Sequence, residues 1–310
     1  MGINMDILYT LEKLRVPFFN YFFLGISYLG AEIMSAIVVF SVYWCISKRD
    51  GYYIFANILF GSGLNQIIKT ICHVPRPFVA HKDFTIVEKA RSTAEGLSFP
   101  SGHTQNSTSL YGSLFALYKK RAFRIFCAVM IGLVGFSRLY LGAHYPTDVL
   151  GGFINGLIIL AVVSLLFRRF ESSPNFIWIL FGVGGIALLA AGLIFEIGPG
   201  RTILEPEEMG SMLKGMYMCS GVSLGIALGE PIERKYVRFE TDAVWWGQIL
   251  KAAAGLLLIL VLALALKYPA QAVFKELKVA YVPRFFVPVV FGICVWPAVF
   301  GRLGFLSRRK

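Results

Sequence analysis

The sequence predicts an all-α polytopic membrane protein, and three observations support this. The mean hydropathy of the 310 residues is +0.66, 56% are hydrophobic and only 15% are charged. Long apolar runs alternate with short basic clusters. A soluble domain does not need so much apolar surface, and most runs approach the ~17–25 residues that cross a bilayer. We therefore expect a membrane helical bundle of about nine transmembrane helices with an N-terminal interfacial helix.

The first 29 residues are expected to form the interfacial segment. They begin with an amphipathic stretch that carries Asp6, Glu12 and Lys13 and continue with the aromatic run Phe18 to Phe23. This pattern is typical of a helix that lies in the membrane interface. The early charges leave no compact apolar core before a small-residue site, which argues against a cleavable signal peptide.

Nine apolar runs follow the interfacial segment. They lie at about 30–46, 51–71, 102–118, 123–137, 149–167, 176–195, 210–229, 244–266 and 285–303. The spacing of Gly152 with Gly156, and of Gly221 with Gly225 and Gly229, favours close contact between helices. We divide the chain into the segment 1–29, a core at 30–170, and additional C-terminal helices at 171–310, whose role the sequence does not indicate.

Basic clusters predict the orientation. Lys119-Lys120-Arg121 and Arg168-Arg169 lie directly beside apolar runs, as cytoplasmic clusters do. The segments 72–101 and 137–148 then face outward from a plasma membrane, with the N-terminus outside and the C-terminus inside. The net charge of +12 is spread over such clusters, which suits anionic lipid headgroups, so we expect the lipid bilayer and no nucleic acid as a partner. The five cysteines lack paired or metal-ligand spacing, and we expect them to serve in packing.

The stretch 137–148 brings Arg138, His144 and Asp148 to the edge of an apolar run. Ionisable residues at such a position are costly and point to function. Pro146 suits the first turn of a helix, so Asp148 should lie in that turn with His144 within its reach. Such a pair fixes the tautomer of an imidazole. Taken alone, the stretch is equally consistent with a capped helix and an interfacial histidine.

Two further motifs lie at span ends on the same face. Lys69 ends one span, and prolines on both sides of Arg76 restrict its backbone. Ser101-Gly102-His103 precedes an apolar run, where Ser101 suits an N-cap and the first amides of a helix can bind an anion. Taken one at a time, neither motif requires a phosphate site. Lys69 and Arg76 are better explained as anchors for lipid headgroups, and Ser101-Gly102-His103 as an ordinary capped helix start. Together they predict a phosphate site in which cations, without a metal, stabilise the phosphoryl charge.

These motifs resemble the three-part signature of the type 2 phosphatidic acid phosphatase superfamily. The matching patterns are Lys69-x6-Arg76-Pro77, Pro100-Ser101-Gly102-His103 and Ser137-Arg138-x5-His144-x3-Asp148. The resemblance covers about residues 50–160 and implies a helical phosphatase with no cofactor and no metal. It also implies that His144 forms a phosphohistidine, that Asp148 orients His144 and that His103 protonates the leaving group. The residues implied to bind phosphate are Lys69, Arg76, Ser101, Gly102 and Arg138.

The leading hypothesis is an integral-membrane phosphatase that hydrolyses a lipid phosphomonoester or diphosphate, such as a phosphatidate, a polyprenyl diphosphate or a sphingoid phosphate. A lipid phosphotransferase could use the same phosphohistidine. An anion transporter would need polar residues deep in several spans, and Asn65, Gln66 and Asn155 are the few candidates. Vanadate-dependent haloperoxidases share the site chemistry by resemblance but are soluble. The lipid and the oligomeric state stay open.

Overall fold

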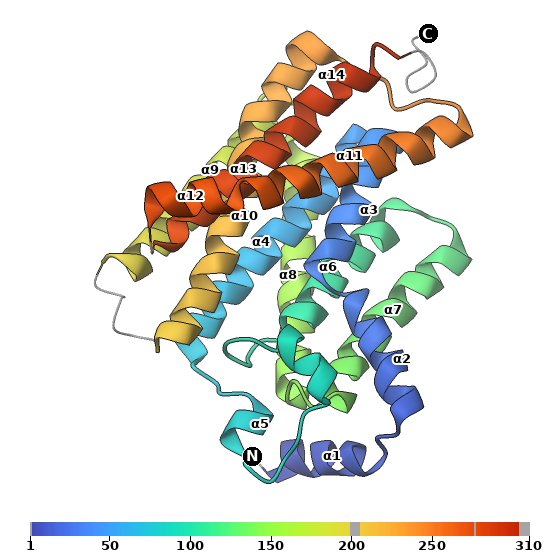
Figure 1. Ribbon diagram of the computed structural model, residues 1–310. Coiled ribbons are helices and arrows are strands. Elements are labelled where there is room, and N and C mark those ends of the chain that lie inside the picture. The colour runs from blue at the N-terminus through green and yellow to red at the C-terminus, as the bar shows by residue number, and fades with distance from the viewer. Residues whose placement is uncertain (1, 199–204, 276, 304–310) are drawn as a thin grey trace. The chain divides into compact units, whose positions relative to one another are not determined.

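The computed structural model describes residues 2–198, 205–275 and 277–303 (Figure 1). These residues form helices and connecting loops, with no strand among them. The chain packs as two compact units. The first contains Met1–Ser35, Phe60–Val163 and Thr202–Met212, and the second contains Ala36–Leu59, Ser164–Arg201 and Leu213–Lys310.

The first unit holds the N-terminal helices and the three polar motifs. It contains α1 (Gly2–Lys13), α2 (Pro17–Tyr28), α5 (Pro77–Ala80), α6 (Gly102–Leu117) and α7 (Arg121–Tyr140). It also contains the last part of α4 (Lys48–Cys72) and most of α8 (Pro146–Phe170). Helix α7 packs against α6, α2 and α1 (Figure 1). Small residues allow α8 to approach α6, because a Cβ on Gly152 would lie 2.4 Å from the carbonyl oxygen of Ser101.

Helix α1 and the residues that directly follow it contact the segments around the third motif. The guanidinium of Arg15 donates to the carbonyl oxygens of Tyr140, at 2.9 Å, and Thr85, at 2.8 Å. Met5 and Leu8 of α1 are buried in one apolar cluster with Phe84 and Tyr145. The predicted interfacial segment is therefore helical and also packs onto the residue that follows His144.

The second unit contains the C-terminal helices. These are α9 (Phe176–Glu196), most of α10 (Pro206–Ile232), α11 (Trp245–Ala265), α12 (Lys267–Phe274), α13 (Tyr281–Val290) and α14 (Trp296–Phe300). The unit also takes in most of α3 (Glu32–Cys45) and the first part of α4. A Cβ on Gly221 or Gly225 would lie 2.5 or 2.9 Å from a carbonyl oxygen of α13. The predicted role of this glycine spacing in close helix contact is confirmed.

The described residues include six helical segments that are long and apolar enough to cross a membrane, or seven if α2 and α3, bent by 46°, form one span. The six are α7, α8, α9, Pro206–Val237, Trp245–Phe274 and Lys278–Phe300. The expected spans at 51–71 and 102–118 are helices α4 and α6, but these two do not meet the same criteria of length and apolarity. The expectation of a helical integral membrane protein is confirmed, and the count of nine spans stays a prediction.

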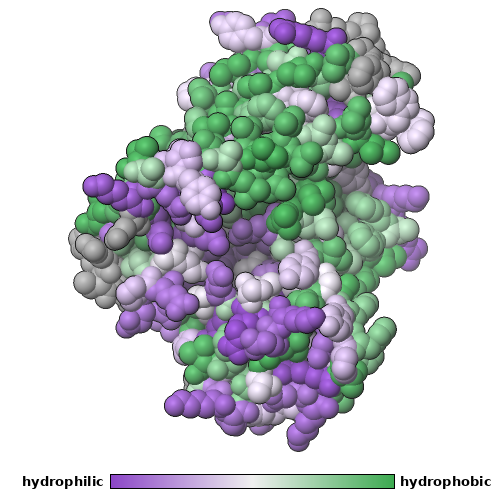
Figure 2. Space-filling model, viewed as in Figure 1, coloured by the Kyte–Doolittle hydropathy of each residue, from purple (hydrophilic) through white to green (hydrophobic). Residues whose placement is uncertain are grey.

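Large apolar side chains cover much of the surface, as the extended hydrophobic areas in Figure 2 show. Val183 on α9 is 65% exposed and Leu257 on α11 is 60% exposed. In water such a surface would be unfavourable, whereas hydrocarbon chains of lipids would solvate it. This surface agrees with an integral membrane protein.

Candidate active site

The three polar motifs meet where helices of the first unit begin and end. Lys69 lies in the last turn of α4, and Arg76 immediately precedes α5. Ser101 caps the N-terminus of α6, Arg138 lies in the last turn of α7, and Asp148 lies in the first turn of α8. His144 stands in the short connection between α7 and α8. Each motif thus presents its polar side chains at a helix end, as the sequence predicted.

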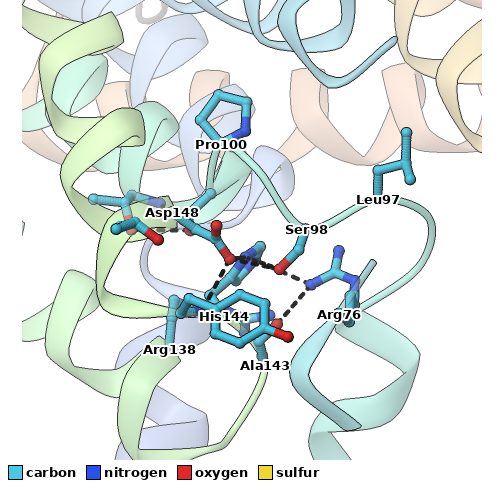
Figure 3. Close-up of polar contacts among 12 residues, drawn as sticks. Arg76, Leu97, Ser98, Pro100, Arg138, Ala143, His144 and Asp148 are labelled. Carbon is cyan, nitrogen blue, oxygen red and sulfur yellow. Dashed lines mark hydrogen bonds and ion pairs between the residues drawn. The ribbon is translucent and has the colours of Figure 1, made fainter. Parts of the chain in front are cut away.

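His144 and Asp148 form a buried pair (Figure 3). His144 Nδ1 lies 3.3 Å from Asp148 Oδ2. The same carboxylate oxygen accepts the backbone N–H of Tyr145 at 2.8 Å and the hydroxyl of Ser98 at 2.5 Å. The predicted contact between His144 and the first turn of the next helix is confirmed, and Ser98 is an additional member of the cluster.

Arg76 determines which nitrogen of His144 carries the proton. Its Nη1 lies 3.1 Å from His144 Nε2, and a guanidinium can only donate hydrogen bonds. Nε2 must therefore accept, which leaves the proton on Nδ1, where it can be donated to Asp148. Burial lowers the pKa of His144 well below its usual value, and nearby charges act in the same direction. The neighbours that contribute are Arg76, Arg138, Lys69 and, as the smallest effect, His103. His144 is accordingly a neutral imidazole at pH 7, with the lone pair of Nε2 beside a cation.

Lys69 and Arg76 both bind main-chain carbonyl groups of the segment 95–98. Arg76 Nε donates to the carbonyl oxygen of Gly96 at 2.8 Å, and Nη2 donates to that of Glu95 at 2.6 Å. Lys69 Nζ donates to the carbonyl oxygen of Leu97 and lies 3.5 Å from that of Ser98. Burial lowers the pKa of Arg76 to about 10, so its side chain still carries a positive charge at neutral pH.

Arg138 is fully buried and reaches two other elements. Its Nη1 donates to the hydroxyls of Ser27, on α2, and Thr93, at 2.5 and 3.1 Å. Its Nη2 donates to the carbonyl oxygen of Thr93 at 3.0 Å. Its Nε is buried and has no hydrogen-bond partner among the described residues. Arg138 therefore keeps a buried donor that an anionic oxygen could use.

The start of α6 has the features expected of an anion site. The Ser101 hydroxyl accepts the N–H of Thr104 at 3.4 Å, so the predicted N-cap is confirmed. A Cβ added to Gly102 would have one atom within 4 Å, Asn65 Oδ1 at 3.8 Å, so space is available beside this backbone. Asn65 Oδ1 is itself buried and has no hydrogen-bond partner in the part of the chain that the structure describes. His103 follows and is partly buried.

Ser98 and Asn65 were not predicted as members of the site. Ser98 meets Asp148 across 50 residues, and no periodic pattern relates these two positions. Asn65 precedes Lys69 by one helical turn on α4, which places both side chains on the same face of the helix. This spacing could have indicated that Asn65 lies near the site. No group of three His, Cys, Asp or Glu side chains that could hold a metal ion occurs in the described parts of the chain.

Known proteins resemble this chain in both halves. Residues 50–172 match the PAP2 superfamily, and residues 217–309 match the PAP2 superfamily phosphatase transmembrane extension. The chain is 35% identical over 125 residues to undecaprenyl-diphosphatase BcrC of Bacillus subtilis (strain 168), which covers 40% of this chain and 60% of that relative. It is 31% identical over 164 residues to phosphatidylglycerophosphatase B of the same organism, covering 49% of this chain and 76% of that relative.

A third relative is similar over a longer stretch. The catalytic subunit 1 of glucose-6-phosphatase from Felis catus is 26% identical over 288 residues, which covers 78% of this chain and 79% of that protein. The match to undecaprenyl-diphosphatase is shorter and spans less than two thirds of that relative. The resemblance found in the three motifs is therefore confirmed, and the chain belongs to the PAP2 superfamily.

Proposed function

We propose that this protein is an integral-membrane phosphatase that hydrolyses a lipid phosphomonoester or diphosphate through a phosphohistidine, without a metal ion. The observation that carries the proposal is the state of His144. Its Nδ1–H faces Asp148 at 3.3 Å, and the lone pair of Nε2 lies beside Arg76 at 3.1 Å. A neutral imidazole with an oriented lone pair in a cationic site is suited to attack phosphorus.

The reaction then proceeds in two steps. His144 Nε2 attacks phosphorus, the bond from phosphorus to the leaving oxygen breaks, and His103 donates a proton to that oxygen. Asp148 stabilises the ring of the phosphohistidine through Nδ1–H. In the second step His103 takes a proton from water, the water oxygen attacks phosphorus, and the bond to Nε2 breaks. Inorganic phosphate and neutral His144 are released.

Three cations provide the charge stabilisation that the transition state requires. Phosphate oxygens would replace the carbonyl oxygens of the segment 95–98 as acceptors for Lys69 and Arg76. The free Nε of Arg138 supplies a further donor. The Ser101 N–H already donates to the carbonyl oxygen of Asp148 at 2.9 Å. The Gly102 amide, in the first turn of α6, and the Ser101 hydroxyl would therefore bind the remaining charge.

A lipid substrate is favoured by the surface next to the site. Helix α2 exposes Phe18, which is 73% accessible, and Tyr21, which is 56% accessible, and it contacts Arg138 through Ser27. Arg138, which we propose binds phosphate, thus directly contacts a helix whose aromatic side chains suit a membrane interface. Two relatives are named as a diphosphatase of undecaprenyl diphosphate and a phosphatidylglycerophosphatase, and a third as a glucose-6-phosphatase.

We extend the proposal to the topology. If α2 and α3 form one span, the seven apolar spans together with α4 and α6 make nine. The segments 1–29, 30–170 and 171–310 remain our division of the chain. The basic clusters at 119–121 and 168–169 support a plasma-membrane protein whose site faces outward.

Phosphate release by the purified full-length protein in detergent tests the function. Long-chain phosphatidate, undecaprenyl diphosphate, sphingoid phosphate and glucose 6-phosphate would be compared, for the native protein and for His144→Ala. We expect release from a lipid substrate that depends on His144. Release from glucose 6-phosphate alone would contradict the lipid assignment. Transfer of phosphate to an added alcohol, in place of release, would support the phosphotransferase alternative.

A further inference from the structure

We propose that Ser98 is a positioning residue for the phosphatase reaction. In this role its hydroxyl orients Asp148, and through Asp148 the nucleophile His144, while its main chain connects this pair to Lys69. The inference rests on the proposed function, since it assigns a part in the same phosphohistidine chemistry. It concerns a residue outside the three motifs.

The hydroxyl of Ser98 makes two contacts inside the site (Figure 3). Ser98 is fully buried, with its Oγ 2.5 Å from Asp148 Oδ2 and 3.4 Å from His144 Nδ1. An ionised carboxylate only accepts hydrogen bonds, so the Ser98 proton is directed to Asp148. The oxygen lone pairs of Ser98 then face the Nδ1–H of His144. Both contacts favour the tautomer whose Nε2 lone pair accepts from Arg76 here and would attack phosphorus once Arg76 turns to a phosphate oxygen.

Asp148 Oδ2 consequently receives three donors: the Ser98 hydroxyl, the Tyr145 backbone N–H and His144 Nδ1–H. The two donors from Ser98 and Tyr145 hold the carboxylate while the imidazole changes from neutral to phosphorylated. They also share its negative charge, which reduces the charge available to His144. The hydroxyl of Ser98 therefore affects both the orientation and the pKa of the nucleophile.

The main chain of Ser98 connects this cluster to the first motif. Its N–H donates to the carbonyl oxygen of Val74 at 2.7 Å, between Lys69 and Arg76 in the chain. Its own carbonyl oxygen lies 3.5 Å from Lys69 Nζ. When Lys69 turns from these carbonyl groups to a phosphate oxygen, the main chain at Ser98 loses its contact with Nζ. The main chain that positions the Ser98 hydroxyl is therefore affected. Phosphate binding is thereby linked to the position of Asp148.

Ser98→Ala should affect two quantities in a defined direction. Loss of one hydrogen bond to a charged group should lower kcat about 10- to 100-fold, with little change in KM. Asp148 then directs more of its charge to Nδ1, which stabilises the protonated imidazole and raises the pKa of His144. Nucleophilic attack needs the neutral imidazole, so the acid limb of the kcat/KM profile should move to higher pH.

The experiment uses the full-length protein in detergent and a lipid phosphate that the native enzyme hydrolyses. Ser98→Ala, Ser98→Thr and Ser98→Cys are compared with Ser113→Ala, a matched control. Ser113 is also fully buried, and its hydroxyl donates to the carbonyl oxygen of Ser109 on its own helix at 2.6 Å. The pH profile is recorded over the range in which histidine titrates, and gel filtration checks that each variant folds.

A slower Ser98→Ala enzyme with its acid limb at higher pH, beside an unchanged Ser113→Ala enzyme, supports the proposal. An unchanged acid limb, or a loss equal to that of the control, overturns it, because a merely structural hydroxyl would not move the pKa of His144. Ser98→Thr should recover most of the activity. If Ser98→Ala does not fold, Ser98→Cys takes its place, because cysteine has nearly the same shape but is only a weak hydrogen-bond donor. The shift of its acid limb to higher pH is then the test. An inactive native enzyme would contradict the proposed function instead.

Discussion

Arg76 makes four hydrogen bonds, and the replacement Arg76→Lys tests whether the planar fork is required. The acceptors are the carbonyl oxygens of Glu95, Gly96 and Ala143 and the Nε2 atom of His144, at 2.6, 2.8, 3.0 and 3.1 Å. These acceptors are shared among three nitrogen atoms of the guanidinium. A lysine donates from a single atom and cannot reach all of them.

At least two of these contacts should be lost in Arg76→Lys. Each hydrogen bond that involves a charged group contributes about 1.5–3 kcal/mol, so the combined loss is roughly 3–6 kcal/mol. If all of it were expressed in the transition state, kcat/KM would fall between about 10² and 10⁴-fold. Any part of the roughly 3–6 kcal/mol that is lost from the free energy of folding would instead lower the midpoint of thermal unfolding, which should be measured on the same samples.

The assay is phosphate release from a long-chain lipid phosphate in detergent. Arg124→Lys is the control, because Arg124 is a partly exposed arginine outside the site whose Nε donates to a single carbonyl oxygen, that of Phe115, at 3.1 Å. We expect this control to retain native activity and stability. A kcat/KM of Arg76→Lys within about threefold of native, at unchanged stability, would refute the argument that the fork orients His144 and the phosphate.

Further predictions concern the acid, the charge, the pH dependence and substrate access. His103→Ala should slow a lipid substrate far more than an activated aryl phosphate, because protonation matters only for a basic leaving oxygen; equal losses would remove the acid assignment. Activity should survive EDTA and be inhibited by vanadate, and loss with EDTA that magnesium restores would contradict the cationic mechanism. Since the pKa of His144 is lowered, the acid limb of kcat/KM should lie below pH 6.5, and a limb above that value would contradict the lowered pKa. If the substrate enters the site sideways from the membrane, shortening the lipid chain should cost ~0.8 kcal/mol per buried methylene, and a soluble phosphomonoester turned over equally well would exclude this route of entry. A single cysteine placed at 82–95 should react with an impermeant reagent outside intact cells while one at 119–121 should not, and the reverse pattern would invert the topology.

The sequence was sufficient to locate the helix ends at which the site forms. Ser101 before Gly102 predicted an N-cap, and Pro146 predicted the helix start that brings Asp148 near His144. Both signals are local, because a cap and a proline act within one helical turn. Because these signals are local, the helix ends at Ser101 and Pro146 could be predicted without knowledge of the fold.

Contacts that join distant segments were not predictable in the same way. The hydroxyl of Ser98 reaches Asp148, and Arg138 binds Thr93 and Ser27, across loops that have no periodic pattern. These partners depend on how the loops fold back over the helix ends, and the identity of each residue does not indicate it. A buried serine or threonine is equally compatible with a hydrogen bond to its own helix, as Ser113 shows.

Helix α6 illustrates why the number of spans is not settled by composition. Its residues Thr104 to Ser109 are buried although all six are polar. Thr108 satisfies its hydroxyl on the carbonyl oxygen of Thr104 at 2.8 Å, and Asn106 donates to the carbonyl oxygen of Gly30 at 2.8 Å. The hydrogen bonds come from the helix itself and from its neighbours, so lipid need not solvate these groups. A helix of this kind can lie at membrane depth when other helices surround it, and its polarity then reflects its position within the protein.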